Sequence, residues 1–381
     1  MARYFYYHVI YVGMINVMLF VPWTLIQHRF NGAVSAIVIA VVVGTVLAYV
    51  TTSLFLRFPG MGLPDIINSR LPSGIAIAFN LFGALIWFLA GMLVVYAYSS
   101  TIQQFFNPDM NSYLFLLLMT VAGMWGASRC TRSVQFAQEI LMLLCAPLIL
   151  MILFKAVFSS WLDWDAIRIT AGYVRTPPSF ISLCAATFVF AGYNTLTIYN
   201  RLLPSGTKLR YRWIIPVFCT FFLLVSFFIP IGFHGTVGAA DYLYIWSITA
   251  DSMIMEYGFV YRVLYVFLLL YTALSLMFAM NTWHTAMEFI KACHPKHKPQ
   301  PEQYPVPAVN WWITLAFGAI TMAYAYWTNS TRNQLVHQNW LILRTFSDLL
   351  TTCLLAWFTI KGFRRKKKQP PNAMDAVISD S

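Results

Sequence analysis

The stretch that decides the fold reads Phe188-Val-Phe-Ala-Gly-Tyr-Asn-Thr195, a group of small and polar residues inside an otherwise apolar run. A second apolar run, residues 5–27, is interrupted in a similar way by Gly13, Asn16 and Pro22. A broken helix leaves backbone N–H and C=O groups unpaired, and lipid does not tolerate such groups unless they line a cavity within the protein. Both interruptions are therefore predicted to face an interior site.

These two runs belong to a set of ten apolar segments, each close to the roughly 20 residues that span a bilayer as a helix. The predicted spans are 5–27, 33–56, 75–104, 112–128, 134–158, 180–203, 211–233, 259–289, 308–328 and 340–360. The connections between them are mostly short, so we expect residues 1–363 to form a single transmembrane domain. The predicted fold class is an all-α polytopic membrane protein with ten transmembrane helices.

Ten spans divide into two halves of five, and because five is odd the halves must cross the membrane in opposite directions. This is the 5+5 inverted repeat of many transporters, in which the first helix of each half is broken and holds ligand near the membrane midplane. Here helices 1 and 6 are the interrupted ones, which makes the predicted fold LeuT-like. The alternative interpretation is that Gly, Asn and Pro are simply common in membrane helices.

The composition and the charge distribution indicate a membrane protein with both termini in the cytoplasm. Hydrophobic residues make up 59% of the chain and charged residues 10%, against about 25% charged in soluble domains. Most of the 25 Lys and Arg residues fall on one side of the ten spans, as in cytoplasmic loops. The net charge of +12 thus favours membrane orientation over nucleic-acid binding. Residues 364–381 are predicted to form a basic and then disordered cytoplasmic tail that contacts anionic lipids.

The cysteines and histidines indicate neither a disulfide framework nor a metal site. None of the six cysteines lies in a predicted outer loop. Cys293, His294 and His297 are close in sequence, but they lack the second half of a ligand set. We therefore expect no metal and no cofactor.

Three stretches carry a family resemblance. They are the basic-Phe-Pro turn Arg57-Phe-Pro-Gly-Met-Gly-Leu-Pro-Asp65, the segment from Arg129 to Glu139 that leads to Pro147, and the glycine-broken segment Phe188–Tyr193. Together they resemble the B-subunit family of spore germinant receptors, within the amino acid–polyamine–organocation superfamily. The resemblance implies a non-enzymatic subunit that binds a small germinant, with an amino acid as the expected class, alongside the A and C subunits of a receptor. It also implies the bacterial cell membrane, specifically the inner membrane of the spore.

The chain departs from that family at three places. In helix 1 the family's glycine-rich stretch is replaced by Ile15-Asn-Val-Met-Leu-Phe-Val-Pro22, whose β-branched residues resist unusual backbone angles. Asn194 stands where the family often has Glu, and Tyr261–Leu264 keeps only the arginine of a Glu-Arg-x-Asp pattern. We therefore expect the chain to respond to a ligand different from that of alanine-type relatives, or to respond only together with a second B subunit.

The predicted ligand site lies between the two broken helices. Exposed N–H groups there can bind a carboxylate and free carbonyls can bind an ammonium group, so a zwitterionic amino acid suits the site. The predicted ligand-binding residues are Asn16, Val17, Met18, Leu19, Trp87, Gly192, Tyr193, Asn194 and Thr195. Trp87 is included by analogy with the third helix of such folds.

Two further functions are consistent with the sequence. A transporter of the same fold would move an amino acid or an organic cation by alternating access. A membrane-bound acyltransferase would use His284 as general base, with Asn281 and Glu288 on the same helix face.

Ionisable residues inside a span are functional candidates unless they are paired. Arg344 and Asp348, four residues apart, share a helix face and can neutralise each other. Glu139 is expected to pair with Arg129 or Arg132. We interpret both sets as structural.

Overall fold

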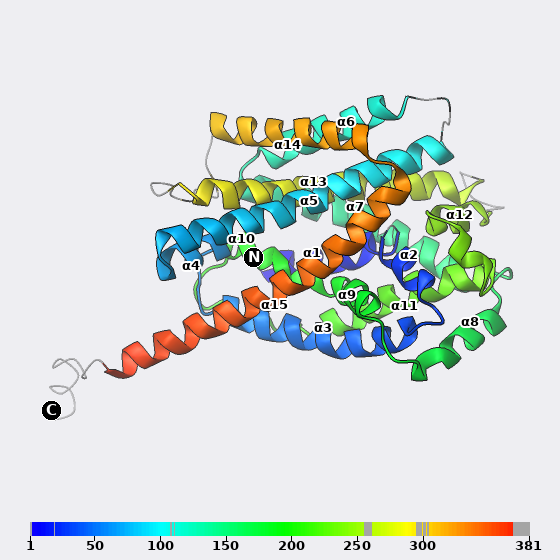
Figure 1. Cartoon of the computed structure of the whole chain (residues 1–381), viewed down its shortest axis with the longest axis horizontal. Coiled ribbons are helices and arrows are strands. Elements are labelled where there is room, and N and C mark those ends of the chain that lie inside the picture. The colour runs from blue at the N-terminus through cyan, green and yellow to red at the C-terminus, as the bar shows by residue number, and fades with distance from the viewer. Residues whose placement is uncertain are drawn as a thin grey trace.

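The computed structural model describes residues 2–18, 20–106, 109, 111–254, 261–294, 299, 302 and 305–368. Most of these residues lie in helices that run along the long axis of the molecule (Figure 1). α4 (Leu63–Arg70) lies at one end of the bundle and α8 (Trp164–Ala171) at the other. We call these the α4 end and the α8 end. The predicted all-α architecture is confirmed.

Seven helices in the described part of the chain are long and apolar enough to cross a membrane. They are α3 (Ala33–Phe55), α5 (Ser73–Phe105), α7 (Thr131–Val157), α11 (Ile214–His234), α13 (Val263–Ala292), α14 (Ala308–Trp327) and α15 (Ser330–Lys368). Each matches a predicted span within a few residues, except α15. Hydropathy alone is sufficient to place these helices because lipid requires a long apolar run.

α15 differs from its prediction at both ends. It begins at Ser330 rather than at residue 340, because the polar residues before Trp340 are buried in the bundle and continue the helix. The buried polar side chains are Asn333, Gln334 and His337. The helix also continues to Lys368, so the basic part of the predicted tail, residues 364–368, is helical. Residues 369–381 lie outside the described residues.

Two predicted spans are each built from two helical pieces that meet at a break. α1 (Ala2–Ile15) and α2 (Phe20–Gln27) are bent by 49°, and α9 (Phe180–Phe188) is bent by 61° against the helical turns that follow it. Those turns are η2 (Ala191–Thr195), α10 (Leu196–Tyr199) and η3 (Asn200–Leu202). Both breaks fall at the predicted interruptions, so helices 1 and 6 are broken as expected.

The count of ten spans depends on α6 (Ser112–Ala127). Counting each bent pair as one span gives up to nine in the described residues. α6 is apolar but has 16 residues, slightly fewer than the roughly 17–25 that usually cross the hydrocarbon layer. The number ten therefore stays a prediction. The remaining short helix, α12 (Ile245–Asp251), packs between α11 and α13.

Helix contacts recur between the two halves of the chain. α1 packs against α7 and α11, and the other broken span, α9, packs against α15 and α3. α13 packs against α6 and α7, and α5 packs against α14 and α15. α5 and α13 also lie side by side through the middle of the bundle (Figure 1). In the predicted numbering of ten spans, each of these contacts has an equivalent five spans away.

The outer surface of the bundle is apolar along several helices. Large hydrophobic side chains are exposed on α3, α6 and α7, for example Val42, Leu118 and Leu144. Soluble monomers rarely expose continuous apolar surface of this kind, whereas lipid tails accept it. The surface and the apolar helices together identify a multi-pass membrane protein.

Candidate functional site

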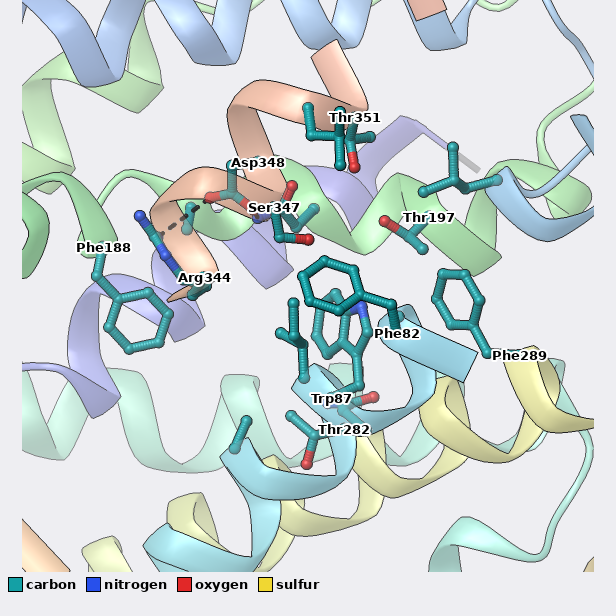
Figure 2. A pocket seen from close by; sticks show the side chains of 18 of the residues that line it. Phe82, Trp87, Phe188, Thr197, Thr282, Phe289, Arg344, Ser347, Asp348 and Thr351 are labelled. Carbon is teal, nitrogen blue, oxygen red and sulfur yellow. Dashed lines mark hydrogen bonds and ion pairs between the residues drawn. The ribbon is translucent and has the colours of Figure 1, made fainter. Parts of the chain in front are cut away.

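A cavity lies near the centre of the bundle, between the broken α9–η3 segment, α1, α5, α13 and α15, and it extends to α4. Its volume is ≈ 70 Å³, which accommodates several waters or a small solute, because one water needs about 10–15 Å³. Phe82 and Trp87 of α5 lie opposite Ser347 and Asp348 of α15 (Figure 2). An apolar surface with a few convergent polar groups is typical of a small-molecule site.

A buried ion pair on α15 lines this cavity. Arg344 Nη1 lies 3.3 Å from Asp348 Oδ2, and the two side chains are 6% and 10% exposed. The four-residue spacing places both on one helix face, as the sequence predicted. Asp348 Oδ1 accepts a hydrogen bond of 2.9 Å from the side chain of Asn194. The ion pair is thereby tied to the break in the α9–η3 segment.

The ion pair leaves hydrogen-bonding capacity unused. Among the described residues, Nε and Nη1 of Arg344 and Oδ2 of Asp348 have no hydrogen-bond partner. Arg344 Nη2 donates to Thr345 Oγ1 at 3.1 Å, and the guanidinium carbon lies 4.9 Å from the ring centre of Phe188 (Figure 2). Buried polar atoms in proteins nearly always have partners. Two of these atoms, Nη1 and Oδ2, face each other in the ion pair, and all three are buried without a hydrogen bond.

Four rings stand between this cavity and the α8 end. Phe188 and Trp340 line both the main cavity and a smaller one of ≈ 10 Å³. Their rings meet edge to face with centroids 5.2 Å apart, and Phe20 stacks on His337 at 3.6 Å. His337 lies two turns nearer the start of α15 than Arg344. The rings therefore close the cavity on the α8 side, and we call them the aromatic closure.

A second cluster of buried charges lies at the α4 end, beside the cavity. Arg201, whose side chain is 2% exposed, donates to the two carboxylate oxygens of Asp65 at 2.7 and 2.9 Å and to Glu288 at 2.5 Å. Lys291 donates to the other oxygen of Glu288 at 2.6 Å. This ionic cluster joins α4, η3 and α13. The cluster was not predicted from the sequence, although Arg201 lies at the end of the broken span and Asp65 at the end of the Phe-Pro stretch.

The predicted ligand residues are divided by the structure. Trp87 and Asn194 line the main cavity, and Asn16 lines the smaller one. Five others are buried but line neither of these cavities: Val17, Met18, Gly192, Tyr193 and Thr195. Leu19 lies outside the described residues. Ligand binding at these positions stays a prediction, and the polar groups of α15 are an addition to it.

Side chains satisfy backbone groups near the break between α1 and α2. Asn16 Nδ2 donates to the Val12 carbonyl at 2.7 Å. Tyr271 of α13 donates from its hydroxyl to the Met14 carbonyl at 3.2 Å. Backbone polar groups inside a membrane must be hydrogen-bonded within the protein, and at this break side chains provide partners for two carbonyls.

Gly192 has a packing role at the other break. A Cβ atom at this position would lie 2.5 Å from the Cα of Val9. The absence of a side chain thus lets η2 approach the backbone of α1. This contact holds the two broken spans together.

The structure corrects the predicted partner of Glu139. Its carboxylate lies 3.1 Å from Arg3, because the start of α1 packs beside α7. Arg132 instead pairs with Glu302 at 2.6 Å. The predicted pairing of Glu139 with Arg129 or Arg132 is therefore wrong.

His284 is enclosed by helix packing. Its Nε2 lies 3.0 Å from Thr131 Oγ1 and its Nδ1 lies 2.9 Å from the Ala127 carbonyl. Asn281, its predicted companion, is hydrogen-bonded instead to Tyr199 and Gln138. His284 is also absent from the lining of the main cavity.

Comparison with known proteins identifies the fold and no family. No protein-family model and no curated protein matches the sequence. Solved structures do match. A Na⁺-coupled sialic acid symporter in a substrate-bound outward-open state has a TM-score of 0.52 and 13% identity over 85% of this chain and 74% of the symporter. The nucleobase-cation-symport-1 transporter Mhp1, closed around bromovinylhydantoin, has a TM-score of 0.44 and 12% identity, with 91% and 74% covered. The chain shares the LeuT-like fold of the sialic acid symporter.

Proposed function

We propose that the chain is a membrane transporter that binds a small zwitterionic solute, with an amino acid as the expected class, and moves it by alternating access. The buried pair Arg344–Asp348 carries this proposal. The Arg344 guanidinium can donate to a solute carboxylate, and Asp348 Oδ2, which faces Arg344 in the ion pair, can accept from a solute ammonium group that enters between them. Ionisable residues at membrane depth generally mark such a pathway.

The proposed architecture has ten spans in a 5+5 inverted repeat, with both termini in the cytoplasm. The recurring helix contacts and the two broken spans support the repeat. The positive-inside pattern supports a cytoplasmic α4 end. In this orientation the cavity has one closure on each side: the aromatic closure towards the outside and the ionic cluster of Asp65, Arg201 and Glu288 towards the cytoplasm.

Alternating access then needs each closure to open in turn. The outer side opens when the stacked rings of Phe20 and His337 separate. The inner side opens when Arg201 leaves Asp65 and Glu288. Because both closures contact a broken span, movement of those spans can open one and close the other.

The proposal is tested by uptake into liposomes. Purified protein is reconstituted and supplied with each of the twenty radiolabelled amino acids, and Arg344→Gln is measured in parallel. Arg332→Gln is the matched control because Arg332 lies on an exposed part of α15. We expect saturable uptake of at least one amino acid by wild type and by R332Q, and loss of at least tenfold in R344Q. The proposal would be overturned if the wild-type protein neither bound nor took up any amino acid.

A germinant-sensing role is the second candidate, and one contact favours it. Asp65 belongs to the stretch that resembles germinant-receptor B subunits, and it binds Arg201 beside the cavity. A solute that shifts the broken span would thus move a cytoplasmic loop within reach of A and C subunits in the inner membrane of a spore. Amino acid binding without uptake, together with copurification of such subunits, would favour sensing over transport.

We propose a structural role for His284 in place of acyl transfer. Both of its ring nitrogens lie within hydrogen-bond distance of packed helices. A general base needs a nitrogen that is free to reach its substrate. Unchanged uptake in His284→Gln at normal abundance would support this role.

A further inference from the structure

Four buried polar side chains form a continuous hydrogen-bonded chain beside the cavity. The Tyr199 hydroxyl donates to Asn281 Oδ1 at 2.6 Å, and Asn281 Nδ2 donates to Gln138 Oε1 at 3.0 Å. The Gln138 side chain in turn contacts His8 Nδ1. The four residues come from α10, α13, α7 and α1, so the chain connects both broken spans to two unbroken ones.

The direction of this chain determines the protonation of His8. Gln138 Oε1 and Nε2 lie 3.0 and 2.7 Å from His8 Nδ1. Nε2 is the closer of the two atoms, and because an amide nitrogen donates and cannot accept, it is the atom that donates to His8. His8 Nδ1 must then be an acceptor without a proton, and a neutral imidazole carries its proton on the other nitrogen. The chain therefore holds His8 as the Nε2–H tautomer.

The protonated nitrogen of His8 is the one available to the cavity. The His8 ring lines the cavity, and among the described residues no hydrogen bond reaches its Nε2. We infer that His8 donates a hydrogen bond from Nε2 to an acceptor oxygen of the bound solute, and that Tyr199, Asn281 and Gln138 act as positioning residues. This inference rests on the proposed function and adds a recognition group that comes from α1.

The surroundings of His8 suit a fixed neutral donor. The rings of Tyr11 and Tyr199 contact it at centroid distances of 5.7 and 6.4 Å. From α7 and α13 it is faced by the neutral amides of Gln138 and Asn281. The charged groups that share its cavity are the paired Arg344 and Asp348 of α15. The two charges compensate each other, so they supply little net field to charge the imidazole.

The tautomer is tested directly by ¹⁵N NMR of histidine-labelled protein in lipid, with His8→Phe used to assign the signal. We expect an unprotonated Nδ1 and a protonated Nε2 in wild type. In Gln138→Glu a carboxylate can accept at the same place, so both nitrogens of His8 should become protonated. A wild-type signal with the proton on Nδ1 would overturn the inference.

The solute contact is tested by the KM of the amino acid that wild type takes up fastest from the panel of twenty. Loss of a hydrogen bond to a charged group predicts a rise in KM of about tenfold or more in His8→Phe. His8→Gln retains an amide donor and should recover most of the wild-type KM. An unchanged KM in H8F overturns the contact while leaving the transport proposal intact. If wild type neither binds nor takes up any amino acid, the proposed function fails together with the contact, and NMR still decides the tautomer.

Discussion

Asn194 donates from Nδ2 to Asp348 Oδ1 at 2.9 Å, and this bond joins the break in the α9–η3 segment to the middle of α15. The other oxygen of the same carboxylate, Oδ2, lies 3.3 Å from Arg344 Nη1. One carboxylate thus connects a broken span to a buried cation that lines the cavity. Any solute that binds this carboxylate acts on both elements at once.

The ion pair predicts an asymmetry between single and double substitutions. Removing one partner of a buried pair leaves an uncompensated charge, which costs about 3–5 kcal/mol. We expect Arg344→Met and Asp348→Leu each to lower the thermal stability of the purified protein strongly. The double variant should be more stable than either single variant. Equal stability of all four proteins in a thermal unfolding assay would contradict the buried pairing.

The bond from Asn194 predicts the effect of introducing the residue that the germinant-receptor family often has there. In Asn194→Glu a second carboxylate would lie next to Asp348, and Asp348 would lose the hydrogen bond that it accepts from Asn194. We expect lower abundance and weaker uptake at neutral pH than in Asn194→Gln, which keeps an amide. Higher uptake in N194E than in N194Q would show that position 194 works differently.

Gly192 predicts a steric requirement at the contact of the broken spans. An alanine Cβ would lie 2.5 Å from the Cα of Val9, and backbone cannot move aside as a flexible side chain can. Overpacking of this kind typically costs about 1–3 kcal/mol. Gly172→Ala is the matched control, because nothing lies within 4 Å of a Cβ at that position. Thermal unfolding should show a loss of stability in G192A and little change in stability in G172A.

The ionic cluster predicts that Arg201 controls access from the α4 end. Arg201→Gln should weaken this closure because Asp65 and Glu288 lose their shared partner. The measurement is labelling of Thr197→Cys, a cavity position, by a membrane-impermeant thiol reagent added from the proposed cytoplasmic side.

We expect labelling to increase several-fold in R201Q. Arg132→Gln is the control, because it breaks an exposed pair with Glu302 and should leave labelling unchanged. No increase in R201Q, or an equal increase in R132Q, would show that the cluster is not a closure.

The proposed topology is tested by reporter fusions. Fusions after Phe106, Arg175 and Thr328 follow the third, the fifth and the ninth predicted spans and should all report the outer side. Fusions after Arg70 and Arg129 should report the cytoplasm. A cytoplasmic signal from any two of the first three would contradict both the orientation and the count of spans.

The membrane-spanning segments were predictable from the sequence because a helix that crosses lipid needs a long run of apolar residues. The bounds of α3, α5 and α6 and the two breaks follow from runs of apolar residues and their interruptions. The start of α15 was not predictable in this way, since the polar residues before Trp340 are buried by neighbouring helices.

The partners of the charged residues also depend on distant parts of the chain. Arg201 binds Asp65 and Glu288, which are 136 and 87 residues away in sequence. Glu139 was assigned to the nearby Arg129 or Arg132 but binds Arg3, and helix packing decides this choice. Arg344 and Asp348 were predictable as a pair because they are one helical turn apart. Their position on the cavity was not, because the sequence does not say which face of α15 meets the broken span.

The uninterrupted length of α15 has a mechanical consequence. The helix runs from Ser330 to Lys368 and extends beyond the rest of the bundle at the α4 end (Figure 1). At 1.5 Å per residue, Lys368 lies about 30 Å beyond Asp348 along the helix axis. A rotation of only about 5° at Asp348 would swing that far end by roughly 2.6 Å. With the proposed solute bound at Asp348, a small rotation of α15 would therefore become a larger movement of its basic end outside the bundle.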